Sequence, residues 1–234
     1  MPRSYLVTAI LVISLALNGC QTATRVARED LNAIRGADVI RVVHAKAPKM
    51  HVESPGQFVA DQVGGVFGIV GGLIAAAIAQ SQAAGQGDNL VQELELSDPV
   101  VLVRDRFLEA LKDRVRIRTV EVIDTPVDSL EIDQLKRRFT NGLLLTIKTS
   151  VWAVGIKNLR DGYHLRYHAD AALHRLDDSK VLWRDGCHPD VDSHAPVSLE
   201  ELRAENGRRL KERLTAAAER CVQELAADFF HEDG

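Results

Sequence analysis

The densest group of chemistry-bearing side chains is the stretch "HPDVDSH" at residues 188–194. Its four potential metal ligands are His188, Asp190, Asp192 and His194. Imidazole nitrogens and carboxylate oxygens at such short spacing can hold zinc or another divalent ion. One hypothesis is therefore a metal-binding protein or a metal-dependent hydrolase, and the alternative is a polar loop that holds no metal.

The other histidines do not extend this cluster. His164, His168 and Asp170 fall on one face of a predicted strand, but strand positions four apart are separated by about 13 Å, too far for one ion. The chain also lacks a G-x-S-x-G elbow, a phosphate-binding loop and an H-E-x-x-H pair. These features favour a protein that is not an enzyme and that uses no cofactor.

Cys20 ends the first apolar run of the chain. Arg3 is the only charge among the residues before it. The apolar residues 5–17 are fewer than the ~20 that a membrane-spanning helix needs. A short positive region followed by a short apolar core is typical of an export signal.

The sequence "LNGC" at residues 17–20 resembles a bacterial lipobox. The resemblance implies a signal peptide over residues 1–19, a lipidated Cys20 and a tether over residues 20–36. Gln21 stands where lipoproteins of the inner membrane typically carry Asp, which implies the outer membrane, facing the periplasm. The alternative is an ordinary signal peptide followed by an incidental cysteine.

The two remaining cysteines, Cys187 and Cys221, would meet an oxidising compartment after export. We expect a disulfide between them, and two free buried thiols are the alternative. Cys187 ends the last predicted strand, and Cys221 lies on the apolar stripe of the last predicted helix. A bond between them would pin that helix to the sheet.

A glycine-rich apolar segment occupies residues 62–87 and carries no charge. Its small residues at helical spacing include Gly64, Gly68, Gly71, Gly72 and Ala75. Stripes of this kind let helices pack at short distance, and the segment resembles the glycine zippers of bacterial envelope lipoproteins. Three hypotheses remain: a self-associating or membrane-inserted helix, a helix or hairpin packed on the chain's own domain, and a flexible Gly/Ala-rich loop.

The composition fits one exported domain. The chain has 234 residues, of which 46% are hydrophobic, enough for a single domain with a real core. The formal net charge of −4 argues against nucleic acid as a partner. We expect one domain over residues 37–230, which contains the glycine-rich insertion, and a short tail at residues 231–234.

Periodicity predicts an α+β fold. A short helix is expected within residues 21–36, and prolines and a glycine break the chain over 46–56. Strands are predicted at 37–45, 116–124, 143–156, 163–176 and 181–187. Helices are predicted at 97–115, 130–139 and, opened by a Ser198–Glu201 capping box, at 198–229. This order predicts a mixed sheet of about five strands with helices packed on one face.

The element order and the hairpin "YHLRYHADAALHRLDDSKVLW" at residues 163–183 resemble a group of periplasmic proteins. The group comprises lipoproteins of the curli-secretion CsgG type, the penicillin-binding-protein activator LpoB and the N-terminal domain of TolB. The resemblance implies partner binding, oligomer assembly or pore formation rather than catalysis.

These observations together predict an outer-membrane lipoprotein that acts as a non-catalytic envelope scaffold, assembly factor or secretion accessory factor. The lipid anchor would bind the membrane, and the glycine stripe would mediate self-association or contact with an envelope protein. The competing hypotheses are the metal site at His188–His194 and a lipid or glycan transport accessory, which would need an apolar groove.

Overall fold

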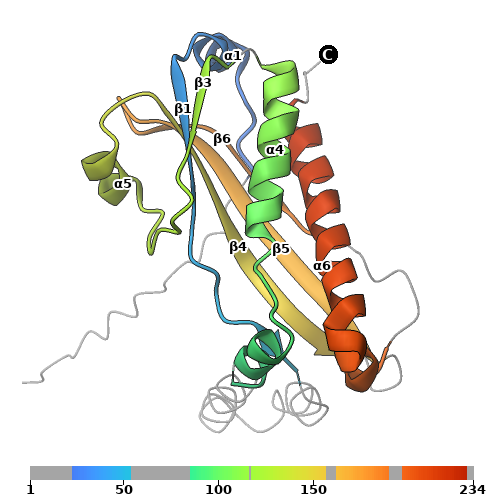
Figure 1. The fold of residues 1–234 in the computed structure, drawn as a ribbon. Coiled ribbons are helices and arrows are strands. Elements are labelled where there is room, and N and C mark those ends of the chain that lie inside the picture. The colour runs from blue at the N-terminus through green and yellow to red at the C-terminus, as the bar shows by residue number, and fades with distance from the viewer. Residues whose placement is uncertain (1–22, 54–84, 116, 157–161, 190–196, 231–234) are drawn as a thin grey trace, which may run out of the picture.

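The computed structural model describes residues 23–53, 85–115, 117–156, 162–189 and 197–230. It confirms the predicted α+β class (Figure 1). In chain order, the elements are α1 (Arg28–Arg35), β1 (Val39–His44), β2 (His51–Val52), α4 (Val100–Arg114), β3 (Thr119–Val122), α5 (Ile132–Arg138), β4 (Leu143–Ile156), β5 (Tyr163–Arg175), β6 (Lys180–Cys187) and α6 (Leu199–Phe229). Residues 85–93 are also helical.

The strands form one mixed sheet in the order β3-β1-β4-β5-β6, and the short β2 pairs separately with β4. β1 is parallel to β3 and to β4, whereas β4, β5 and β6 form an antiparallel meander. The parallel pairings follow crossovers that contain α4 and α5, and β5 and β6 form the hairpin predicted at residues 163–183. The mixed topology therefore agrees with the predicted order of elements.

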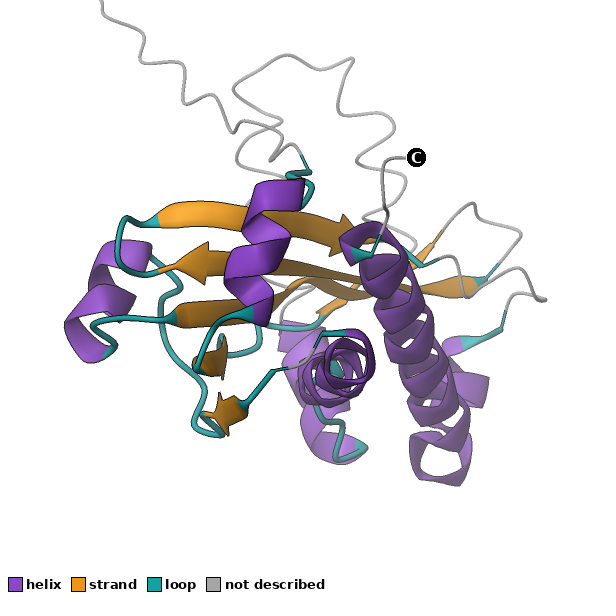
Figure 2. Cartoon of the chain, turned by 90° about the horizontal axis from the view of Figure 1, so that it is seen from above, coloured by secondary structure: helices purple, strands orange, loops and turns teal. Residues whose placement is uncertain are grey.

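Two long helices, α4 and α6, pack together on one side of the sheet (Figure 2). Successive residues of a strand point to opposite faces, so Val42 and Leu145 enter the large core beneath these helices. Val43 and Leu144 point the other way, into a smaller cluster that contains Leu135 of α5. The sequence predicted helices on one face of the sheet only. The short α5 also covers part of the second face.

The alternation predicted for residues 163–176 is present over residues 165–170 of β5, whereas residues 171–174 are all buried. Leu165, Tyr167 and Ala169 belong to the large core, whereas Arg166 and His168 occupy the second face and are exposed or half-buried. Aromatic side chains close the core beneath α4 and α6. The ring centroid of Trp183 lies 5.4 Å from that of Phe107 and 5.1 Å from that of Phe229.

The structure corrects the prediction for residues 46–56, where a break in secondary structure was expected. His51 and Val52 form the two-residue strand β2, opposite Ala153 and Val154 of β4. Met50 and Val52 are buried in the large core. Burial against a long neighbouring strand stabilises this short strand despite the prolines around it, which local sequence could not reveal.

The last helix begins with the predicted capping box, in which Ser198 and Glu201 exchange hydrogen bonds. Its helical conformation is interrupted at residues 204–207, where three successive residues have positive φ. Gly207, at φ +68°, is one of them, and a Cβ atom there would lie 2.7 Å from Cδ1 of Leu94. Glycine at this position therefore permits both the left-handed turn and the close packing of residue 94.

Candidate functional site

A disulfide joins Cys187 to Cys221, as the sequence predicts. The two Cα atoms are 5.1 Å apart, and both residues are fully buried. The bond connects the end of β6 to the second half of α6, which packs on β5 and β6. It therefore fixes the long helix to the antiparallel half of the sheet.

Most of the other predicted site residues lie outside the part of the chain that the structure describes. They are Cys20, the stripe of Gly64, Gly68, Gly71, Gly72 and Ala75, and three of the four potential metal ligands, Asp190, Asp192 and His194. Lipidation, close helix packing and metal binding at these positions all stay predictions.

His188 is the one described member of the predicted metal cluster. Its ring lies edge-on to His168 of β5, with 4.3 Å between ring centroids, and its backbone N–H donates to Glu224 of α6 at 2.9 Å. Burial, followed by electrostatic interaction with His188 and Arg166, lowers the pKa of His168. Spacing along one strand does not reveal this pair, because His168 lies in β5 and His188 directly follows the neighbouring strand β6.

The absence of a side chain at Gly186 leaves room for the side chains of Asp170 and His188. A Cβ atom at Gly186 would lie 3.0 Å from Oδ1 of Asp170 and 3.8 Å from Nε2 of His188. Within the described ranges, however, no group of three His, Cys, Asp or Glu side chains is arranged to hold a metal ion.

The segment before α1, assigned by sequence to the tether, is attached to the edge of the sheet. Thr24 forms an antiparallel bridge with Arg184 of β6, through hydrogen bonds of 2.7 and 2.8 Å between their backbone groups. Val26 packs against the large core, and Ile34 of α1 is buried within it. The chain is thus fixed to the domain from residue 24 onward.

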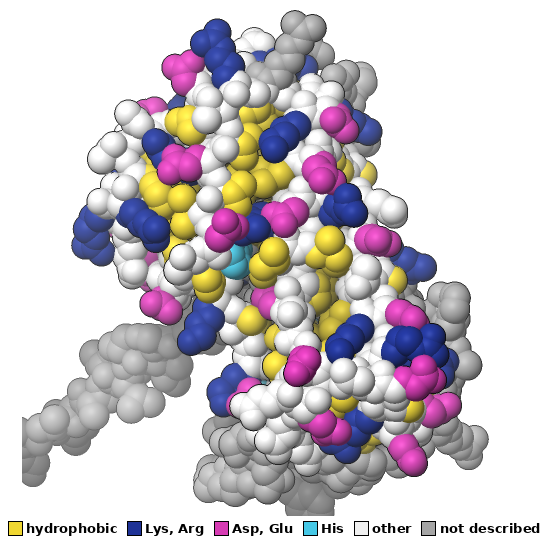
Figure 3. All heavy atoms as spheres, in the orientation of Figure 1, with side chains coloured by type: hydrophobic (Ala, Val, Ile, Leu, Met, Phe, Trp, Pro, Cys, Tyr) yellow, Lys and Arg dark blue, Asp and Glu magenta, His cyan; other side chains and the backbone are white. Residues whose placement is uncertain are grey.

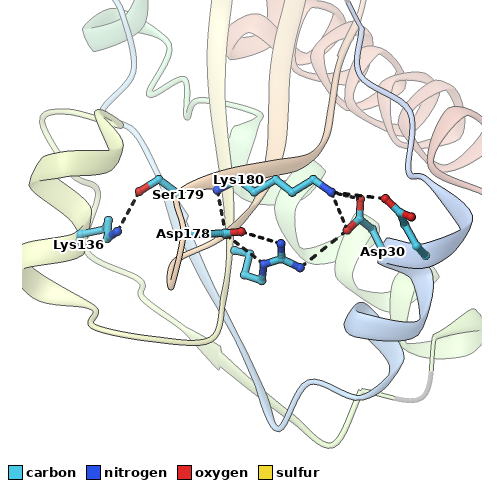
Figure 4. A network of polar contacts seen from close by, with 7 residues as sticks. Asp30, Lys136, Asp178, Ser179 and Lys180 are labelled. Carbon is cyan, nitrogen blue, oxygen red and sulfur yellow. Dashed lines mark hydrogen bonds and ion pairs between the residues drawn. The ribbon is translucent and has the colours of Figure 1, made fainter.

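An ionic network holds α1 on the turn between β5 and β6 (Figure 4). The side chain of Asp30 is only 6% exposed and accepts hydrogen bonds of 2.9 and 3.0 Å from Lys180. Arg175 reaches Asp30 at 3.8 Å and donates to Asp178 at 2.7 and 3.0 Å. The sequence predicted the turn, but not its contact with a helix 150 residues earlier.

A second side chain ties the same turn to the other helical element. Lys136 of α5 donates a hydrogen bond to the hydroxyl oxygen of Ser179 at 2.9 Å (Figure 4). Ser179 has a positive φ of 60°. The β5–β6 turn is therefore held by α1 and by α5, which belong to distant parts of the chain.

A partly buried carboxylate lies just before the start of α4. Asp98 accepts a hydrogen bond from the hydroxyl of Thr149 at 2.6 Å and another from the backbone N–H of Val100 at 3.0 Å. Its Oδ2 atom has no hydrogen-bond partner among the residues that the structure describes. Burial raises the pKa of Asp98, and burial, followed by the charge of Arg104, lowers the pKa of His44.

A groove of about 420 Å³ opens between residues 95–105 and α6. Its apolar lining includes Leu96, Pro99, Val101, Leu102 and Leu214, and its polar lining includes Asp98, Asp105 and Lys211. Val101 is 39% exposed, and Figure 3 shows hydrophobic side chains at the surface near the lower end of α4. Such a lining could contact an aliphatic segment that is flanked by charged groups.

None of the helices in the described ranges is both long enough and apolar enough to cross a membrane. The glycine-rich residues 62–84 lie outside those ranges. Their predicted contact with a membrane or with another chain therefore stays a prediction.

Comparisons with known proteins find distant similarity in structure. No protein-family model matches the chain, and no curated protein matches its sequence. A dodecamer of PelC from Paraburkholderia phytofirmans is 10% identical, covers 89% of this chain and 94% of its own, and gives a TM-score of 0.35. A DUF330 protein from Xanthomonas campestris is 13% identical over 82% of this chain and 85% of its own, with a TM-score of 0.37. Lipoprotein GNA1162 from Neisseria meningitidis is 13% identical over 80% of this chain and 98% of its own, with a TM-score of 0.25.

Proposed function

We propose that this protein is a lipid-anchored, non-catalytic scaffold or accessory factor on the periplasmic face of the outer membrane, and that it acts as an oligomer. The observation that carries the proposal is the way the three cysteines are divided. Cys187 and Cys221 bond to each other inside the domain, which suits an oxidising compartment. Cys20 is left at the end of an export signal, where a lipobox-like sequence provides a reason for a free thiol.

The glycine-rich segment supplies the means of assembly in this proposal. Glycine costs a helix about 1 kcal/mol relative to alanine, so a stripe of glycines needs a compensating contact. Close approach of two backbones provides that compensation through van der Waals packing. Gly68 lies at the centre of the four-residue spacing from 64 to 72. A larger side chain there would hold the two backbones apart.

The test is the mass of the mature lipidated protein in mild detergent, measured by light scattering, together with that of Gly68→Leu. We expect a defined oligomer for the parent protein and a monomer for the variant. The matched control is Gly85→Leu, because a Cβ atom at Gly85 meets nothing within 4 Å, and this variant should keep the parent mass. If the parent and both variants are monomers of equal stability, self-association through the stripe is wrong.

The metal hypothesis makes a different prediction for the same preparation. Stoichiometric, tightly bound zinc in the parent protein, absent from His188→Ala, would replace the scaffold proposal with a metal site at residues 188–194. Metal content by mass spectrometry of the purified protein distinguishes the two. We expect the parent and the variant to have the same low metal content.

A further inference from the structure

We propose that the β6 edge of the sheet lies against the headgroup layer of the membrane that holds the acyl chains of Cys20. The inference rests on the lipidation of Cys20 in the proposed function. It adds an orientation: a specific edge of the domain faces the lipid, and the β3 edge is free to face a partner.

The length of chain between the anchor and the fold carries the first step. Thr24 is the fourth residue after Cys20. A fully extended chain spans at most about 3.3–3.6 Å per residue, so the Cα atom of Thr24 stays within roughly 14 Å of that of Cys20. Because the acylated cysteine sits at the membrane surface, Thr24 must lie close to the headgroups whatever path the intervening residues take.

The second step is that Thr24 cannot move away from the sheet without breaking contacts. Its backbone N–H and C=O both pair with Arg184 of β6. Val26 then packs on the large core, and α1 follows with Ile34 fully buried. The ion pair between Asp30 and Lys180 holds α1 on the β5–β6 turn (Figure 4). The short tether is therefore attached to a segment that is packed against the domain. Its length limits the distance between the whole domain and the membrane.

The third step is the position of β6 at one edge of the sheet. The order β3-β1-β4-β5-β6 places β3 at the opposite edge. Neighbouring strands lie about 4.8 Å apart, so β3 is about 19 Å farther from the tether across the sheet. An anchor that reaches only β6 brings that edge to the membrane and leaves the β3 edge as the distal one.

Charge does not provide a simpler explanation for membrane contact at this edge. Of the basic side chains around the β5–β6 turn, Arg175 is paired with Asp178 and Lys180 with Asp30, while Lys136 donates to the hydroxyl of Ser179. Exposed charges that are already paired give a lipid surface little net attraction. The orientation should therefore depend on the length of the tether rather than on the ionic strength.

The test compares two positions at the same end of the strands. Asp177 lies in the exposed β5–β6 turn, and Thr119 begins β3 and is also exposed. Strand pairing places both positions at the same end of the sheet. Thr119 pairs with Val39 of β1, and the next residue of β1 pairs with Leu143 of β4. Leu143 in turn pairs with Arg175 of β5, two residues before Asp177. Asp177→Cys and Thr119→Cys are each labelled with one fluorophore, with the buried disulfide left oxidised. The lipidated proteins are placed in phosphatidylethanolamine/phosphatidylglycerol vesicles that contain an acceptor-labelled headgroup lipid.

We expect more efficient energy transfer to the lipid from position 177 than from position 119. Inserting twenty Gly and Ser residues after Gln21 extends the reach by roughly 25 Å, and the difference between the two positions should then be lost. Equal transfer from both positions in the parent, or a difference that survives the insertion, would overturn the orientation. If the protein does not bind vesicles and carries no acyl mass, the proposed lipidation fails instead, so the two failures are distinguishable.

Discussion

Nζ of Lys180 in β6 lies 2.9 Å from Oδ2 of Asp30 in α1, across 150 residues of sequence. The carboxylate is almost fully buried, whereas the side chain of Lys180 is 41% exposed. This pair and the Thr24–Arg184 bridge attach the N-terminal segment to the edge of the sheet. The residues from Thr24 to the end of α1, which the sequence assigned to a tether, therefore pack as part of the folded domain.

Asp30→Ala should lower the free energy of unfolding by about 1–2 kcal/mol, because it removes a buried acceptor of two charge-assisted hydrogen bonds. Urea unfolding followed by circular dichroism measures the change. The control is Asp38→Ala, whose ion pair with Arg118 is exposed, with both side chains at least 78% accessible. That variant should stay within about 0.5 kcal/mol of the parent. Equal effects of the two substitutions would contradict a structural role for the Asp30 pair.

Reducing the Cys187–Cys221 bond should destabilise the domain by about 3–4 kcal/mol, the chain-entropy value for a loop closed over a separation of 34 residues. The measurement is urea unfolding with and without a phosphine reductant. The double variant Cys187→Ala/Cys221→Ala should show the lower stability in both conditions. A parent protein whose stability does not respond to complete reduction, verified by thiol counting, would rule out this contribution.

His174 should make the protein less stable in acid. Burial, followed by the charge of Arg184, lowers the pKa of His174 to about 4. Its folded pKa lies below the unfolded value of about 6.5, so the imidazole is neutral in the fold. Its contribution to stability is full above pH 6.5 and is lost as the pH falls toward 4. The lowered pKa values of His44 and His168 act in the same direction, and the raised pKa of Asp98 opposes them at low pH.

The measurement is the free energy of unfolding between pH 7.5 and pH 4, compared between the parent and His174→Gln. The variant should have a shallower slope because glutamine has no proton to gain. Titration of the His174 ring by NMR provides an independent check. A ring that titrates near 6.5 in the folded protein would contradict the predicted burial.

Two glycines among the helical residues 85–93 should respond oppositely to alanine. A Cβ atom at Gly87 would overlap the backbone carbonyl of Met50, whereas one at Gly85 meets open space. Met50 is buried, so its backbone has little freedom to move. Gly87→Ala should destabilise the domain by about 2 kcal/mol or more through this strain. Gly85→Ala should leave stability unchanged or raise it by up to about 1 kcal/mol, as expected for alanine in a helix. Thermal unfolding of the two variants compares them, and a Gly87→Ala protein as stable as the parent would show that residues 50 and 87 do not pack as described.

Local sequence determined most of the longer elements of this fold. The strand predicted at residues 143–156 has the same bounds in the structure, and the predicted alternation separates buried from polar positions over residues 165–170 of β5. These features are encoded within a few residues, by β-branched side chains, by the period of two and by turn residues. The pairing of Cys187 with Cys221 was also accessible, because an exported chain with two such cysteines has one intramolecular way to oxidise them.

Only the tertiary structure decided which distant segments became neighbours. It placed His188 against His168, Asp30 against Lys180 and Gly87 against Met50, and it added the two-residue β2 to the side of β4. None of these contacts leaves a local pattern, because each depends on how strands order themselves and on which helix covers which face. Those choices follow from burying the whole apolar surface at once, a property of the complete chain rather than of any one segment.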